Sequence, residues 1–329
     1  MRFVRLAGIS MAISLAVAAQ PASVIVDTDA GSDDLMALAF LLAHPSIRIE
    51  AMTVANGMAH VDAGARNLLR LLELADRKHV PVFAGRAAPL RGTAEFPREW
   101  RKISDELPGV ALPPASRQPA PRPAAEYLIE RLRDRNHPVT ILALGPLTNL
   151  GETIRRAPSS TDTIKEVVIM GGAVRVPGNL ADGGVFHTDN KTAEWNMFVD
   201  PLAARIVFRS GVKIRLIPLD ATNTVPIGAD FLREFQSQAH SPLARFVAQV
   251  LNADRETIDQ GIFYAWDPLA AVALLFPDAV DVHPMHIDVK QTAPEEGRTI
   301  ETPGSPNARV ALAGDPAVFR RSFLQAFQQ

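Results

Sequence analysis

The chain has 329 residues, of which 47% are hydrophobic and 6% aromatic, and its formal net charge is −2. A chain of this length and composition can bury a large core. It has no basic stripe with interleaved aromatic residues, so nucleic acid is excluded as an expected partner. The absence of cysteine excludes thiol catalysis, zinc–thiolate sites and iron–sulfur clusters.

Residues 1–20 differ in character from the rest of the chain. Arg2 and Arg5 precede an apolar stretch that ends in small residues around Ala18, which is the layout of a secretory signal peptide. The apolar run is shorter than the about 20 residues that cross a bilayer. We therefore expect a cleaved leader, a periplasmic or secreted domain over residues 24–329, and no membrane association after cleavage. A buried N-terminal helix, a membrane anchor or a cytoplasmic location are the alternatives.

From residue 22 onward, apolar strand-like runs alternate with helical patterns, which is typical of a parallel sheet covered on both faces. We predict a single α/β domain with an open, mostly parallel central sheet, helices on both faces, and a small β-hairpin edge near the C-terminus. The proline-rich stretch 112–123 is interpreted as a surface loop of this domain. The expected strands are 22–29, 49–54, 80–85, 139–145, 164–172 and 213–220, and the expected helices are 32–44, 64–77, 123–135, 146–157, 200–210 and 315–327.

Small and polar residues follow four of the expected strands. They are the aspartate-rich run after the first strand, Asn56 and Gly57 after the second, "LGPLTN" at 144–149, and "MGG" at 170–172. In open α/β sheets, ligands bind beyond the carboxyl ends of the strands. The sequence therefore predicts one shared crevice at that edge.

Four aspartates crowd the end of the first strand: Asp27, Asp29, Asp33 and Asp34. A helix N-terminus favours nearby carboxylates by about 0.3–1 kcal/mol each, which accounts for only some of them. Neighbouring buried carboxylates cannot all stay ionised unaided, so the run needs a cation. Donors that are all oxygen select a hard ion such as Ca²⁺ or Mg²⁺. An EF-hand loop is excluded because it requires a glutamate where this run has Leu38.

An aspartyl phosphatase is a second interpretation of the same run. "VIVDTDA" at 24–30 resembles the first motif of the haloacid dehalogenase-like phosphatases, which would make Asp27 a nucleophile. That family has Thr or Val two residues after the second aspartate, and this chain has Gly31 there. The match is therefore weak.

The chain is more similar to the inosine–uridine-preferring nucleoside hydrolase family. "DTDAGSDD" at 27–34 matches the family's N-terminal D-x-D-x-G-x-D-D signature position for position. Further segments follow in the family's order: "RNLLRLLELA" (66–75), "PLTNL" (146–150), "EVVIMGGA" (166–173), "PGN" (177–179), "AEWNMFVDPLAA" (193–204) and "WDPLAAV" (266–272). The resemblance implies a Ca²⁺-dependent N-glycosidase that splits nucleosides into free base and ribose, and hence a role in nucleoside salvage.

The resemblance also implies roles around the metal. Asp29 is similar to the residue that contacts Ca²⁺ and acts as general base on the water that the metal holds. Asp34 and Asp267 resemble further metal ligands, and Leu144 stands where the family supplies a backbone carbonyl. Asp27 is expected behind them, orienting the other carboxylates.

For the sugar, the resemblance places Asp33 on the ribose hydroxyls. The remaining residues implied on the substrate side are Met170, Asn179, Glu194 and Asn196. Asn56 is expected to contact the sugar or the metal-bound water, although the family's glycine–asparagine pair is displaced here. Such acceptors would favour ribose over deoxyribose.

The leaving-group end departs from the family pattern. Many members carry a histidine before the late aspartate, where this chain has Trp266. The W-D pair resembles the purine-specific branch, in which tryptophans stack on the base, so Trp266 and Trp100 are expected to bind a purine. A tryptophan is also an ordinary core residue, which is the alternative for each.

Three further alternatives remain open from the sequence. The enzyme could prefer pyrimidines or accept both base classes, or the chain could be a periplasmic nucleoside-binding protein without turnover. Family members commonly form homodimers or homotetramers, so we expect one of these states.

Overall fold

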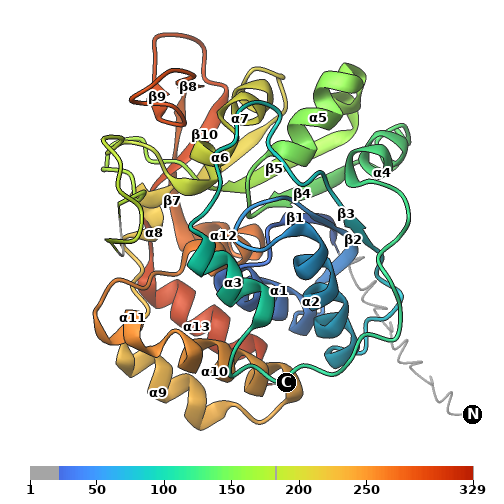
Figure 1. The fold of residues 1–329 in the computed structure, drawn as a ribbon, viewed down its shortest axis with the longest axis vertical. Helices are drawn as coiled ribbons and strands as arrows, with labels where there is room; N and C mark the ends of the chain where they lie inside the picture. The colour runs from blue at the N-terminus through green and yellow to red at the C-terminus, as the bar shows by residue number, and fades with distance from the viewer. Residues whose placement is uncertain (1–21, 182–183, 329) are drawn as a thin grey trace, which may run out of the picture.

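The computed structural model describes residues 22–181 and 184–328, so the expected leader lies outside the described residues. An eight-stranded sheet runs through its centre (Figure 1), and all neighbouring strands are parallel except β7, which is antiparallel to β10. The mostly parallel sheet predicted from the sequence is confirmed. In spatial order the strands are β3 (Val82–Ala84), β2 (Ile47–Val54), β1 (Ala22–Thr28), β4 (Val139–Ala143), β5 (Ile164–Met170), β6 (Ile214–Ile217), β10 (Ala308–Gly314) and β7 (Val280–Met285).

Both faces of the sheet are covered because its central strands are apolar on both sides. In β1, Val24 and Val26 pack into one hydrophobic core, whereas Ile25 between them packs into another. This alternation follows from the twofold side-chain period of a strand. It explains why β1 appears in the sequence as an unbroken apolar run.

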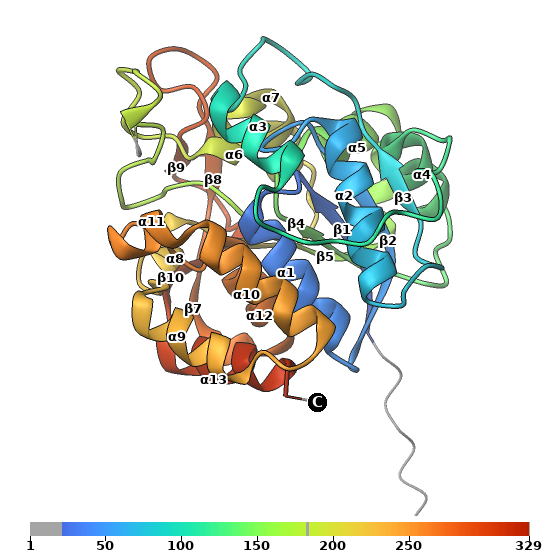
Figure 2. The ribbon, with the colours of Figure 1, turned by 60° about the horizontal axis from the view of Figure 1, so that its bottom comes forward.

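Helices form a layer on each face (Figures 1 and 2). The helices that supply the first core are α1 (Ser32–Ala43), α2 (Val61–Leu74), α9 (Ala229–Gln238), α10 (Pro242–Ala253), α12 (Trp266–Leu275) and α13 (Pro316–Ala326). Those that supply the second are α4 (Ala124–Arg131), α5 (Thr148–Arg156) and α7 (Pro201–Phe208).

Several elements were not predicted. Helix α3 (Arg98–Glu106), which carries Trp100, is one of them. Helices α9, α10 and α12 were not predicted either. The remaining additions are short: α6 (Trp195–Val199), α8 (Leu219–Thr222), α11 (Arg255–Asp259), and the 3₁₀ turns Pro158–Thr163 and Pro277–Ala279. The C-terminal β-structure consists of the β7–β10 edge and a separate hairpin of β8 (Ile287–Val289) with β9 (Thr299–Glu301).

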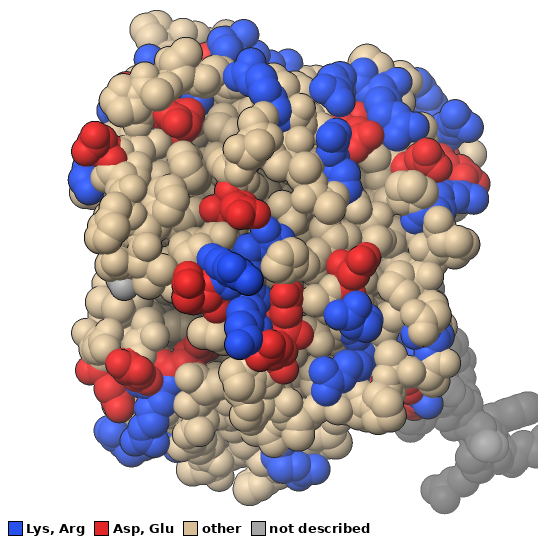
Figure 3. Space-filling model, viewed as in Figure 1, with Lys and Arg blue, Asp and Glu red and all other residues tan. Residues whose placement is uncertain are grey.

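The described surface fits the mixed charge of the sequence. On the face shown in Figure 3, acidic and basic side chains are interspersed. Within residues 22–181 and 184–328, no helix is both long enough and apolar enough to cross a bilayer. The proline-rich stretch 112–123 runs without helix or strand, apart from one bridge between Ala120 and Phe83.

A phenylalanine cluster joins α13 to α1 and α9, and Phe323 is fully buried at its centre. Its ring stacks on Phe40 and Phe319 at centroid distances of 5.5 and 5.4 Å. We expect Phe323→Ala to lower the free energy of unfolding by about 3–5 kcal/mol because it leaves a cavity. Chemical denaturation measures this loss, and Ile103→Ala, at a side chain that is 54% exposed, is the control that should change it by less than about 0.5 kcal/mol.

Candidate active site

The turn from β1 into α1 fixes the carboxylate of Asp34. Asp34 accepts hydrogen bonds from the Thr28 hydroxyl, from the Asp29 amide at 3.3 Å and from the Gly31 amide at 3.0 Å. The last of these satisfies a backbone donor at the start of α1. The segment Thr28–Gly31 therefore positions the Asp34 side chain through one hydroxyl and two backbone amides.

Asp33, Asp34 and Asp267 come together at the carboxyl edge of the sheet. Each offers an oxygen, and these oxygens all lie within 4.8 Å of one another. Asp267 arrives from the first turn of α12, which packs against α1. Asp34 and Asp267 are both only 2% exposed, and Asp267 Oδ1 is buried with no hydrogen-bond partner. A buried, unpaired carboxylate oxygen beside two other carboxylates fits a cation site.

Asp29 is enclosed by backbone on two sides. Its Oδ2 accepts a hydrogen bond from the Met58 amide at 2.7 Å. A Cβ atom at Gly57 would lie 2.0 Å from Asp29 Oδ2, and one at Gly145 would lie 2.8 Å from Asp29 Cβ. Glycine is required at both positions because any side chain there would displace the Asp29 carboxylate.

Burial and mutual repulsion raise the pKa values of this group of carboxyls. Burial raises the pKa of Asp33 to about 8, with a further contribution from the charge of Asp34. Burial and then Asp34 hold the pKa values of Asp29 and Asp267 well above their usual range. Burial also raises the pKa of Asp34, against the opposing hydrogen bonds from its neighbours. A divalent cation would reverse these shifts by compensating the negative charge.

Asp27 lies behind this group, in the wall of the site. Its Oδ1 accepts hydrogen bonds from the Thr53 hydroxyl at 2.7 Å and from Asn149 Nδ2 at 2.8 Å. Burial raises the Asp27 pKa to about 6. The role of Asn149 was missed in the sequence, although the residue belongs to the "PLTN" segment.

Glu194 and Asn196 connect the next two strand ends. Glu194 is the N-cap residue of α6. Its carboxylate accepts hydrogen bonds from the backbone amides of Asn196 at 2.9 Å and Gly172 at 2.8 Å. Asn196 Nδ2 donates to the carbonyls of Leu144 at 2.8 Å and Met170 at 3.3 Å. The Glu194 carboxyl is buried, which raises its pKa to about 7.

Asn179 lies on the same side of the site. Its Oδ1 accepts a hydrogen bond from the Trp195 amide at 3.3 Å, so it joins the loop before Glu194 to α6. Among the predicted residues, Leu144, Met170 and Glu194 are therefore each hydrogen-bonded to Asn196, and Asn179 is hydrogen-bonded to Trp195, the residue before Asn196.

Asn56 is held by Arg101, a residue that the sequence analysis did not single out. Arg101, on α3, is only 4% exposed, and it donates to Asn56 Oδ1 at 2.6 Å and to Glu95 at 2.7 Å. This bond engages the Asn56 side-chain oxygen. No sequence signal identifies Arg101, since buried and exposed arginines are indistinguishable in one sequence.

The tryptophans fall into two separate aromatic clusters. Trp195 is 4% exposed and packs on Phe96 at 4.8 Å and on Trp100 at 5.6 Å between ring centroids. Trp266 packs on Phe263 and Tyr264 at 5.3 and 5.9 Å. Trp100 and Trp266 are both half-buried, each against its own cluster.

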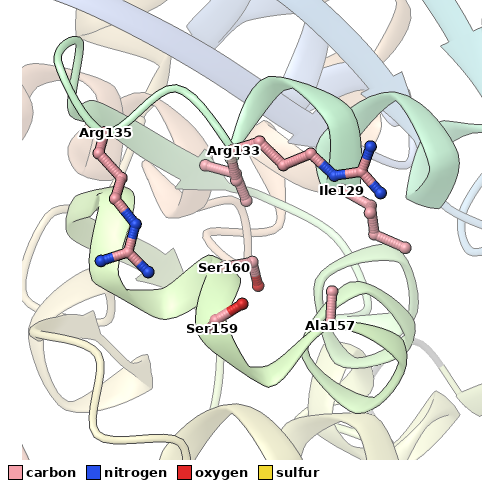
Figure 4. A pocket seen from close by; sticks show the side chains of 7 residues that line it. Ile129, Arg133, Arg135, Ala157, Ser159 and Ser160 are labelled. Carbon is pink, nitrogen blue, oxygen red and sulfur yellow. The ribbon is translucent and has the colours of Figure 1, made fainter.

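A pocket of about 300 Å³ lies elsewhere, between the C-terminal end of α4 and the 3₁₀ turn Pro158–Thr163 (Figure 4). These segments precede β4 and β5 in the chain, so the pocket is at the opposite edge of the sheet from the carboxylates. None of the predicted site residues lines it. We place the functional site at the carboxylates, because a buried unpaired oxygen of Asp267 lies there beside other repelling carboxylates.

The fold and this site together define an α/β protein with an acidic, metal-compatible centre at the carboxyl edge of its sheet. Residues 24–321 match the model of the inosine–uridine preferring nucleoside hydrolases. The chain is 35% identical to uridine nucleosidase 1 of Arabidopsis thaliana, over 77% of this chain and 74% of the other. It is also 35% identical to the pyrimidine-specific ribonucleoside hydrolase RihA of Salmonella schwarzengrund, over 70% of each chain.

Solved structures agree with these matches. A plant nucleoside hydrolase has a TM-score of 0.83 at 28% identity and covers 94% of this chain and 99% of its own. The purine-preferring ribonucleoside hydrolase of Gardnerella vaginalis has a TM-score of 0.80 at 25% identity, over 93% of this chain and 98% of its own. The chain belongs to the inosine–uridine preferring nucleoside hydrolase family and is a hydrolytic N-glycosidase. The aspartyl phosphatase alternative receives no support from these matches.

Repulsion among these carboxylates predicts how the free energy of unfolding responds to a charge removal and to a divalent cation. In chelator at pH 8, Asp267→Asn should raise the free energy of unfolding by about 1 kcal/mol or more, because it removes one charge from a crowded buried group. Divalent cation should stabilise the wild type, by about 2.7 kcal/mol at one hundred times the dissociation constant, and should leave the variant unchanged. Thermal unfolding with and without CaCl₂ measures both effects, and the exposed Asp278→Asn is the control. A variant that still gains stability from the cation would contradict the site.

Proposed function

We propose that the chain is a Ca²⁺-dependent ribonucleoside hydrolase. The observation that carries this is the meeting of Asp33, Asp34 and Asp267 within 4.8 Å, with one buried oxygen left unpaired. The donors are all oxygens, which Ca²⁺ and Mg²⁺ prefer. Ca²⁺ accepts more ligands at less regular angles, and it fits a site built from three chain segments better than Mg²⁺, which demands a near-ideal octahedron.

The ligands that we assign to the ion are the side chains of Asp34 and Asp267, which meet Asp33 in the structure, together with the side chain of Asp29 and the carbonyl of Leu144. A divalent ion bound there would orient a water and lower its pKa. Asp29, fixed by the Met58 amide at 2.7 Å, is the base that would take the proton of a water attacking C1′ of the ribose. The pKa of Asp29 is raised by burial and then by repulsion from Asp34, and the ion would relieve this repulsion.

The remaining polar residues would hold the sugar. Asp33 accepts hydrogen bonds from ribose hydroxyls, and Asn179, Glu194 and Asn196 line the same side, with Met170 at the border. As the bond to the base breaks, positive charge develops on the ribosyl group, and the surrounding carboxylates stabilise it electrostatically. The hydroxyl contacts explain a preference for ribose, since a site that hydrogen-bonds a hydroxyl discriminates strongly against its absence.

For the base, we propose a preference for purines, supported by Trp266 next to the metal ligand Asp267 in the sequence. An indole surface stacks well on a two-ring base. Pyrimidine preference is the second candidate, favoured by two relatives at 35% identity that are named a uridine nucleosidase and a pyrimidine-specific hydrolase. The purine-preferring enzyme from Gardnerella vaginalis shows that this fold also serves purines.

Asp29→Asn tests the hydrolase proposal directly. Because the amide cannot accept the proton of the attacking water, kcat on nucleosides should fall by about 10²–10⁴. Sugar release from inosine, guanosine, adenosine, uridine and cytidine is measured with and without chelator, and the exposed Asp62→Asn serves as the control. We expect chelator to abolish the wild-type rate and added Ca²⁺ to restore it. Wild-type activity that persists in chelator would exclude the metal.

Trp266→Ala tests the base preference. Loss of base stacking, worth about 1–3 kcal/mol, should lower kcat/KM on inosine about tenfold or more and affect uridine much less. The ratio of the two kcat/KM values is the measurement, and Ile262→Ala, at a side chain 41% exposed nearby in the chain, is the matched control. An unchanged ratio would remove Trp266 from base recognition and leave pyrimidine preference as the better proposal.

A further inference from the structure

Asp254 is a half-buried acid that the mechanism above does not use. It lies where α10 ends and is the N-cap residue of α11. An aspartate at an N-cap normally accepts hydrogen bonds from the first helical amides, but the Asp254 side chain makes no such bond. Its Oδ2 is buried without any hydrogen-bond partner. The usual structural role of this residue type is therefore absent.

The Asp254 side chain faces the N-terminus of α1, where the carboxylates of the active site begin. Helix α10 packs along α1, as Figure 2 shows. The Ser32 side chain faces the Asp254 carboxylate, and the charge of Asp254 reaches Asp33 strongly enough to raise its pKa. The charged side chains of α11 are instead exposed: Arg255, Glu256 and Asp259.

An acid on the side of the base would assist the reaction. When the glycosidic bond breaks, its electron pair goes to the base, and a proton delivered there makes the base a better leaving group. The family's histidine is replaced by Trp266, whose indole N–H does not release a proton at neutral pH. Among histidines near the site in the chain, His60 is exposed and bonded to Asp105 at 2.6 Å. Burial raises the pKa of Asp254 to about 6, which keeps part of it protonated near neutral pH.

We propose that Asp254 is the acid that protonates the departing base in this chain. This inference rests on the proposed hydrolase function. In the step, the bond from C1′ to the base nitrogen breaks and its electron pair stays on the base, which receives the carboxyl proton of Asp254. The water oxygen bonds to C1′, and its proton goes to Asp29. Asp254 then takes a proton from solvent and Asp29 releases one, so that free base and ribose are the products.

Two substrates whose leaving groups differ in basicity distinguish a proton donor from a structural residue at Asp254. Inosine needs a proton on its base, whereas p-nitrophenyl β-D-ribofuranoside releases a stable phenolate that needs none. Asp254→Asn keeps the shape of the side chain and removes the proton. We expect kcat on inosine to fall by about 10²–10⁴, and kcat on the p-nitrophenyl riboside to change by less than about threefold. Asp259→Asn, an exposed acid on the same helix, should change neither rate.

Each other result overturns the assignment. Equal losses on both substrates would make Asp254 a structural or sugar-binding residue, and no loss on either would remove it from the reaction. If His60→Gln instead lost inosine hydrolysis selectively, the acid would be His60. A wild-type protein with Ca²⁺ that cleaves neither substrate would refute the hydrolase function itself. Thermal unfolding of Asp254→Asn, expected to match the wild type, excludes a folding defect as the cause of any loss.

Discussion

Several carboxylates are held close together at the carboxyl edge of this sheet, where burial and mutual repulsion both oppose their ionisation. Asp34 and Asp267 are almost inaccessible, and Asp29 is enclosed between two glycines. Such a group is tolerated only because other parts of the fold hold it in place. The parallel sheet supplies the positions, the helix starts supply backbone donors, and a bound cation would supply the missing positive charge.

The supporting structure connects strand ends that are far apart in sequence. Asn149, at the start of α5, donates a hydrogen bond to Asp27 on β1. Asn196 on α6 donates to the carbonyl of Leu144, just after β4, and to that of Met170, at the end of β5. Amide side chains suit these positions because they donate without adding charge. Their hydrogen bonds hold the strand ends at fixed separations, which a metal site and a ribose site both require. The rigidity of the site therefore comes from neutral residues around the charged ones.

Much of this architecture could be predicted because it has a local signal. Unbroken apolar runs marked the parallel strands, and the spacing of Asp27 to Asp34 marked the acidic turn. Helix α3 could not be predicted in this way, because it is mostly polar and its buried Arg101 is explained only by Asn56 and Glu95, its tertiary partners. Asp254 was missed for the same reason. Its burial and its proximity to Asp33 depend on how α10 packs against α1, and one sequence does not contain that information.

The site thus divides into a part supplied by strand ends and a part supplied by helices. The carboxylates for metal and ribose follow β1 or begin α12, and their geometry is set by the shared sheet. The groups that we propose for the base side come from helical segments: Trp100 from α3, Asp254 from the end of α10, and Trp266 from the start of α12. Helical segments of this kind can change without disturbing the sheet. Under the proposed assignment, relatives named as uridine-, pyrimidine- and purine-preferring enzymes would share the strand ends and differ in these helices. The chemistry that we propose for the leaving base in this chain would then lie in helices rather than in strands.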